Sequence, residues 1–240
     1  MFYFLLPTLI RYNFILVIAA IIPAVFLMIQ TYKLDKLDKE SPLQLWSLVK
    51  AGIFSALIAM VLERVFCYVL DQSLSQDDAL YGVLLYFVIV AYSEEGAKYF
   101  MLRRYSWRSL EFNCQYDGVV YAVFVSLGFA LWENISYVLM YGLSAAIVRA
   151  LTAIPGHACF GVFMGVFYGI SKKYAYRNNK AASTLFSILS VFIPALLHGT
   201  YDYIATYETG TWYFVIFIAA LFIISFILIR SMSKRDRYIR

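Results

Sequence analysis

The sequence predicts an all-α protein, a polytopic transmembrane bundle of about seven spans that forms one integral membrane domain over residues 1–240. Hydrophobic residues make up 62% of the chain and charged residues only 15%, and the mean hydropathy is +0.72. The apolar residues gather in segments long enough to cross a hydrocarbon core of about 30 Å. The polar loops between these segments are too short for a soluble domain.

The predicted spans follow one another along the chain. The first lies between Arg11 and Lys33, where 21 successive residues carry no charge. Ser41 and Pro42 predict the start of the second. Asp117 is expected to cap the fourth. The second to seventh spans are expected at residues 43–70, 80–102, 117–140, 144–171, 181–205 and 212–229.

Basic residues indicate how the bundle is oriented. Of the 20 lysines and arginines, 16 lie within alternate segments at 33–50, 103–108, 172–180 and 230–240. The positive-inside rule makes this side cytoplasmic, which predicts that the N-terminus is outside and the C-terminus inside. The net charge of +5 therefore belongs to membrane loops. We expect the lipid bilayer, and no nucleic acid, as its partner.

Ionisable side chains inside the predicted spans are the candidate functional residues, because charge in hydrocarbon is costly. Glu94 and Lys98 are one helical turn apart, so they share a helix face and can pair. His198 and Asp202 have the same spacing. The candidates, with the neighbouring amide, are Glu94, Glu95, Lys98, Glu133, Asn134, His157, His198 and Asp202. They define an expected catalytic helical core over residues 80–205.

Helix geometry places three of these candidates at a common depth. Glu133, His157 and His198 lie about 21–25 Å from the cytoplasmic ends of their helices. Glu94 lies only about 12 Å in if its helix ends at Leu102. We expect this helix to continue toward Leu110, which removes the mismatch.

Two histidines and several carboxylates are suited to Zn²⁺ with an open position for water. The expected metal ligands are Glu95, Glu133, His157, His198 and Asp202. The expected catalytic residues are Glu94, Glu95, Lys98 and Asn134. The Glu94–Glu95 doublet can divide base and ligand functions because neighbours on a helix point about 100° apart. The sequence leaves open which glutamate has which function.

Three other interpretations remain open at this stage. Without metal, close carboxylates repel one another and form an acid–base pair, as in a glutamic-type protease. A non-catalytic membrane scaffold uses the same residues to hold its helices together. A proton-coupled transporter uses them to carry protons, although no inverted repeat supports that function.

Several other residues have two interpretations each. Asn134 either orients a ligand or makes an interhelical hydrogen bond. Arg149 either pairs with an acidic group or is an ordinary interfacial arginine. The G-x-x-x-G face formed by Gly161, Gly165 and Gly169 predicts close packing against another helix, inside the chain or in a homo-oligomer.

Taken in order, these motifs resemble the PrsW family of intramembrane proteases. The matching residues are Glu94-Glu95-x-x-Lys98, Asp117-Gly118, Phe129-x-x-x-Glu133-Asn134, His157 and His198-x-x-x-Asp202. The family is distantly similar to the CAAX prenyl endopeptidases, which share a Glu-Glu doublet but have a histidine where Glu133 stands. The resemblance implies a multi-pass bacterial cell-membrane protease. Its expected substrate is a single-span membrane protein such as an anti-sigma factor, which receives its first cut near the extracytoplasmic side.

Overall fold

The computed structural model describes the backbone of residues 2–206 and 211–239, with side-chain surroundings from residue 14 onward. Helices account for every long element in this part of the chain. They are α1 (Phe2–Leu34), α2 (Pro42–Ser73), α3 (Ala79–Val83), the π-helix η1 (Leu84–Val90), α4 (Ala91–Ser106), α5 (Asp117–Tyr141), α6 (Leu143–Leu151), α7 (Ala153–Tyr176), α8 (Lys180–Ala205) and α9 (Thr211–Lys234). Seven helical stretches are long and apolar enough to span a membrane, which confirms the predicted polytopic bundle.

Two of the predicted spans differ in detail from the structure. The third consists of α3, η1 and α4 in succession. It passes Leu102 but ends at Ser106, so the expected continuation toward Leu110 is only partly right. The fifth span is broken at Thr152, whose backbone angles (φ −122°, ψ −68°) separate α6 from α7. The break lies just before the Pro155-Gly156 pair in the first turn of α7, and a proline at this position cannot donate a backbone hydrogen bond across the break.

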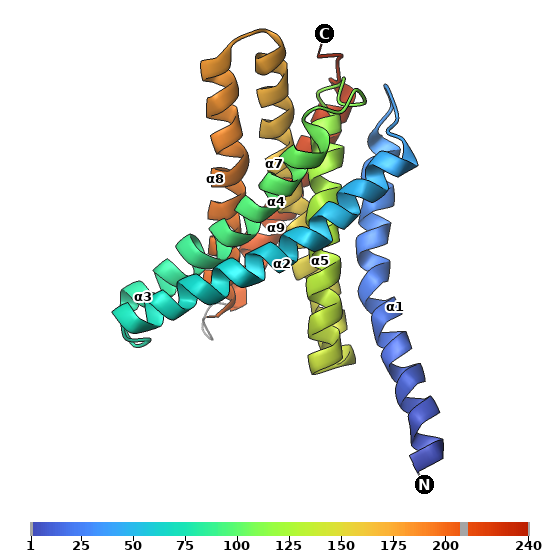
Figure 1. Ribbon diagram of the computed structural model, residues 1–240, viewed down its shortest axis with the longest axis vertical. Helices are drawn as coiled ribbons and strands as arrows, with labels where there is room; N and C mark the ends of the chain where they lie inside the picture. Colours follow the sequence, from blue (N-terminus) through green and yellow to red (C-terminus); the bar gives the residue numbers. More distant parts are fainter. Residues whose placement is uncertain (1, 207–210, 240) are drawn as a thin grey trace.

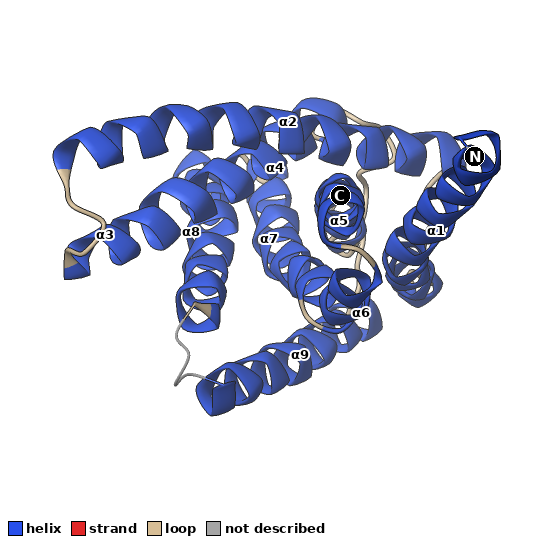
Figure 2. Ribbon diagram, turned by 90° about the horizontal axis from the view of Figure 1, so that it is seen from below, coloured by secondary structure: helices blue, strands red, loops and turns tan. Residues whose placement is uncertain are grey.

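The central helix of the bundle is α5. Figures 1 and 2 show α1, α2 with α4, and α7 around it, with α8 and α9 beyond α7. In the apolar window of α5, 78% of the residues are buried, against 22% for α2 and 11% for α9. The outer helices therefore face lipid, while α5 and α7 form the interior. Side chains that point from α4, α5, α7 and α8 into the bundle are consequently shielded from lipid.

Glycines allow α7 and α2 to pack directly on the backbone of α5. A Cβ added at Gly165 would lie 2.5 Å from the carbonyl oxygen of Gly118. One added at Gly169 or Gly128 would also collide with backbone, of the loop before α5 and of α2 respectively. The G-x-x-x-G face is thus used inside the chain, in keeping with the small-residue packing of membrane helices.

Substituting Gly165 with alanine is expected to destabilise the protein by about 1–3 kcal/mol, because the new methyl group meets backbone that cannot move aside. Thermal unfolding of the purified protein in detergent measures this loss. Gly96→Ala is the matched control, because a Cβ at Gly96 has no neighbour within 4 Å. Equal melting temperatures for the two variants would contradict this packing.

The loops at one end of the bundle fold together with the C-terminal tail. We call this the basic end. It contains the segments 35–41, 107–116 and 177–179 and the tail 235–239, which begins beyond α9. The tail crosses the 107–116 loop, where Gln115 donates to the carbonyl of Arg237 and Ile239 to that of Asn113. Figure 1 shows the C-terminus beside this loop.

Candidate active site

The Glu94–Glu95 doublet on α4 shares one buried lysine. The Lys98 ammonium lies 3.1 Å from Glu94 Oε2 and 2.7 Å from Glu95 Oε1. Glu95 and Lys98 are fully buried, and Glu94 is 7% exposed. One cation therefore compensates two carboxylates, as the spacing predicted for Glu94. Lys98 also lies 4.0 Å from the centre of the Phe129 ring, which adds a cation–π contact.

His157 on α7 lies between Lys98 and Glu133 of α5. Its Nδ1 is 3.2 Å from Lys98 Nζ, and its Nε2 is 2.8 Å from Glu133 Oε2. Because an ammonium group only donates, Nδ1 accepts here. The ring proton then lies on Nε2 and is donated to Glu133.

His198 on α8 completes the group. Its Nδ1 is 2.9 Å from Glu95 Oε1 and its Nε2 is 3.4 Å from Asp202 Oδ2. The ring stacks on Phe160, with centroids 4.8 Å apart, and stands perpendicular to the His157 ring at 5.4 Å. His198 is therefore held in place by α4, α7 and its own helix.

The π-helix η1 directly precedes α4 and packs against α8. It ends at Val90, four residues before Glu94. At Gly199, a Cβ would lie 2.7 Å from the ring of Phe87, so the glycine beside His198 lets η1 pack closely against α8. Segments of π-helix are rare and are frequent at functional sites. No pattern among the residues of this segment predicts the element.

Arg149 adds a second cation at the site. Its Nη2 lies 2.8 Å from Glu133 Oε2, and its Nε donates to Asn134 Oδ1 at 3.1 Å. Asn134 in turn donates to the carbonyl of Ala20 in α1 at 2.9 Å. Of the two interpretations of Arg149, pairing with an acidic group is therefore the one observed. Arg149 lies on α6, which the break at Thr152 separates from α7.

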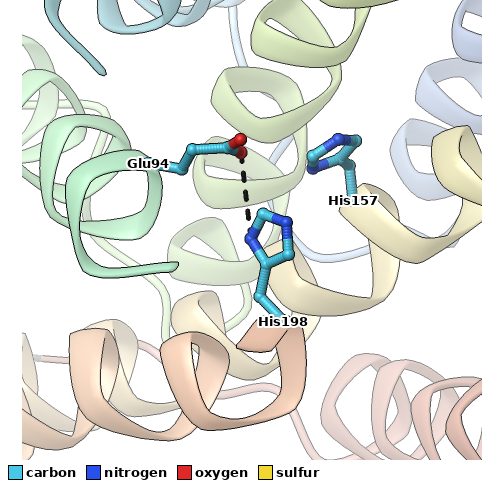
Figure 3. Close-up of side chains that lie close together, drawn as sticks. All are labelled: Glu94, His157 and His198. Carbon is cyan, nitrogen blue, oxygen red and sulfur yellow. Dashed lines mark ion pairs between the residues drawn. The ribbon is translucent and has the colours of Figure 1, made fainter. Parts of the chain in front are cut away.

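Three side chains of metal-binding type converge on one point. One ligand atom each from Glu94, His157 and His198 can be chosen so that all three lie within 4.8 Å of one another. Figure 3 shows these side chains, from three separate helices, directed toward a common centre. One ring nitrogen of each histidine contacts a carboxylate outside this trio, Glu133 or Glu95. Metal-binding histidines are commonly oriented in this way, so the types of donor fit a zinc ion. The ion would take the place of Lys98 at His157 Nδ1, which lies 3.2 Å from the ammonium group.

A cavity of about 350 Å³ opens onto the site. Its polar lining includes Glu94, Glu133, Arg149, His157, His198 and Asp202. Glu63 of α2 also lines the cavity. Tyr137 and Tyr201 are further lining residues that the sequence did not single out. Aromatic residues are so common in this chain that they carry little signal by themselves.

The structure brings together seven of the eight residues expected at the site, all except Asn134. Asn134 reaches the group only through Arg149, by the interhelical hydrogen bonds of its second interpretation. Glu95 lies behind the trio, and one of its oxygens, Oε2, is buried without a hydrogen-bond partner in the described part of the chain. The assignment of metal-binding and catalytic functions to these residues stays a prediction.

Two comparisons with known proteins found relatives of this chain. A family model described as PrsW family intramembrane metalloprotease matches residues 40–229. Protease PrsW of Halalkalibacterium halodurans is 31% identical over 229 residues, which cover 93% of this chain and 100% of the relative. Protease PrsW of Bacillus subtilis is 32% identical over 203 residues, covering 85% and 88%. Protease PrsW of Clostridioides difficile is 31% identical, covering 93% and 91%. No solved structure matches the chain.

These relatives span nearly the same length as the chain, and the family model covers most of it. The seven apolar helices and the bacterial relatives together identify a multi-pass bacterial membrane protein. The chain belongs to the PrsW family of intramembrane proteases.

Proposed function

We propose that the chain is a zinc-dependent intramembrane endopeptidase whose metal is held by Glu94, His157 and His198. The observation that carries this proposal is the convergence of these three ligands from α4, α7 and α8 beside a cavity. Bound zinc supplies a Lewis acid and lowers the pKa of its water toward about 7. Two histidines and one carboxylate are a known ligand set for catalytic zinc.

The remaining residues position these ligands and hold protons. Glu95 orients His198 through Nδ1, and Glu133 orients His157 through Nε2. Lys98 sets the charge of the doublet, because its ammonium group contacts both carboxylates. Glu133 and Asp202 line the cavity, so their carboxylates can accept a proton from an attacking water.

The proposed substrate is a single-span membrane protein, such as an anti-sigma factor, cut near the extracytoplasmic side. The resemblance to the family supports this substrate class. The basic loops support the orientation, with the N-terminus outside and the C-terminus inside. Tyr137, Arg149 and Thr206, near the helix ends opposite the basic end, line the cavity, which favours an extracytoplasmic cut.

A cleavage assay in proteoliposomes tests the proposal. Purified protein is reconstituted with a tagged single-span substrate, and cleavage is followed on gels. Cleavage is expected to stop after treatment with a membrane-permeant chelator and to return when zinc is added, because the proposed chemistry depends on the metal.

Two outcomes would oppose this proposal in different ways. Undiminished cleavage after complete removal of metal would favour the glutamic-type mechanism, in which Glu94, Glu95 and Lys98 act alone. No cleavage of any single-span substrate, together with proton flux through the liposomes, would favour a transporter.

A further inference from the structure

A second group of buried carboxylates lies at the basic end, outside the candidate active site. Asp35 follows α1, Glu40 precedes α2, and Asp117 is the first residue of α5. One oxygen from each can be chosen so that all three lie within 4.8 Å of one another. Asp35 and Asp117 are fully buried, and Glu40 is 3% exposed. Segments far apart in the sequence thus place three acidic side chains beside one another.

Asp117 does not cap its helix as expected. Its Oδ2 instead accepts from the loop amides of Asn113 and Cys114, at 2.9 and 2.6 Å. Its Oδ1 is left buried without a hydrogen-bond partner among the described residues. The backbone of the 107–116 loop therefore fixes Asp117 with one oxygen free to bind a ligand.

Asp35 has no hydrogen-bond or ion-pair partner in the part of the chain that the structure describes, and Lys39 affects it only through its charge. Both of its carboxylate oxygens are buried without a hydrogen bond. Glu40 is oriented by Tyr121, whose hydroxyl donates to Oε2 at 2.5 Å, and it also contacts a fourth carboxyl group, that of Glu111. In its ionised form, a buried, unpartnered carboxylate among two other carboxylates is strongly unfavourable unless a cation joins them.

No lysine or arginine supplies this cation within residues 14–206 and 211–239. All the ion pairs there belong to the candidate active site. The nearby Lys39 instead donates to the carbonyl of Tyr32 and lies over its ring. The charge of the group is therefore left for a bound ion.

We propose that Asp35, Glu40 and Asp117 form a second metal site, for a divalent cation that prefers oxygen ligands, Ca²⁺ or Mg²⁺. All three ligands are carboxylates, the donors that these hard cations take. No histidine lies in the group, and the neighbouring Cys114 thiol donates to Asn113 Oδ1 at 3.0 Å. This chemistry separates the site from the zinc-type donor set of the active site.

A cation at this position joins four parts of the chain. It connects the end of α1, the start of α2 and the start of α5. The C-terminal tail joins them because Asp236 accepts from the amide of Tyr116 at 2.9 Å and lies close to Asp117. The Oδ2 atom of Asp236 is also buried without a hydrogen-bond partner among the described residues. The bound ion therefore stabilises the basic end against the repulsion of its own acidic groups.

Calorimetric titration of the purified full-length protein tests this site. The protein is stripped with chelator, dialysed into detergent buffer, and titrated with CaCl₂ and with MgCl₂. Wild type is expected to bind about one cation per chain, through oxygen ligands, and to melt at a higher temperature with it. His198→Ala keeps this binding, because its substitution lies at the other site. Asp77→Asn, in the exposed loop before α3, also keeps it.

Two substitutions distinguish a loss of cation binding from a general loss of stability. Asp35→Asn removes one buried charge, so the metal-free variant is expected to melt above metal-free wild type while losing the response to the cation. Glu40→Gln keeps an oxygen for Tyr121 and is expected to bind at least about 10-fold more weakly. The proposal is overturned if wild type binds neither ion at millimolar concentration. It is also overturned if binding is unchanged in both variants.

Discussion

Glu94→Gln is expected to lower the cleavage rate by a factor of about 10³ or more, because zinc catalysis contributes several kcal/mol and each 1.4 kcal/mol is a factor of ten. The amide retains the shape of the carboxylate and can still bond to Lys98. It loses the negative charge that, in the proposed site, holds the metal beside His157 and His198. The rate is measured in the proteoliposome assay with equal amounts of folded protein.

Asp77→Asn is the control for Glu94→Gln, because it makes the same change of charge in an exposed loop. It is expected to cleave at the rate of wild type. A Glu94→Gln variant that remains folded and retains full activity would remove Glu94 from the site, and with it the proposed ligand trio.

Lys98→Met is expected to have the largest effect on stability. Removing one partner of a buried ion pair typically costs about 3–5 kcal/mol, because an uncompensated charge remains. Here Glu94 and Glu95 would both lose their cation inside the bundle. A much lower melting temperature in detergent, with poor recovery of folded protein, is the expected result.

A double variant and a surface variant make this prediction specific. Adding Glu95→Gln to Lys98→Met neutralises one stranded carboxylate and is expected to regain part of the lost stability. Lys36→Met, at an exposed position, is expected to have the same melting temperature as wild type. If Lys98→Met also had the melting temperature of wild type, Lys98 would not stabilise the buried carboxylates of Glu94 and Glu95.

The spans and most of the site follow from short-range rules that a sequence displays. Apolar length locates the helices, and a spacing of four residues pairs Glu94 with Lys98 and His198 with Asp202. The cost of charge in hydrocarbon singles out the same residues from their position in apolar segments. These rules concern one helix at a time.

The features that escaped prediction depend on contacts between helices. The π-helix at Leu84–Val90 accompanies close packing at Gly199, and the break at Thr152 accompanies the pairing of Arg149 with Glu133. No local pattern encodes the π-helix, whereas the Pro155-Gly156 pair beside the break is a local signal of a weakened helix. The acidic group at the basic end was missed for the same reason, because two membrane spans separate Asp35 from Asp117 along the chain.

Metal content tests the central claim most directly. Wild type and His198→Ala are purified without chelator and measured by elemental mass spectrometry, with folding checked by circular dichroism. We expect about one zinc per chain in wild type and a large loss in His198→Ala, because two histidines and one carboxylate hold catalytic zinc. Folded wild type without zinc, or an unchanged zinc content in His198→Ala, would contradict a zinc site at Glu94, His157 and His198.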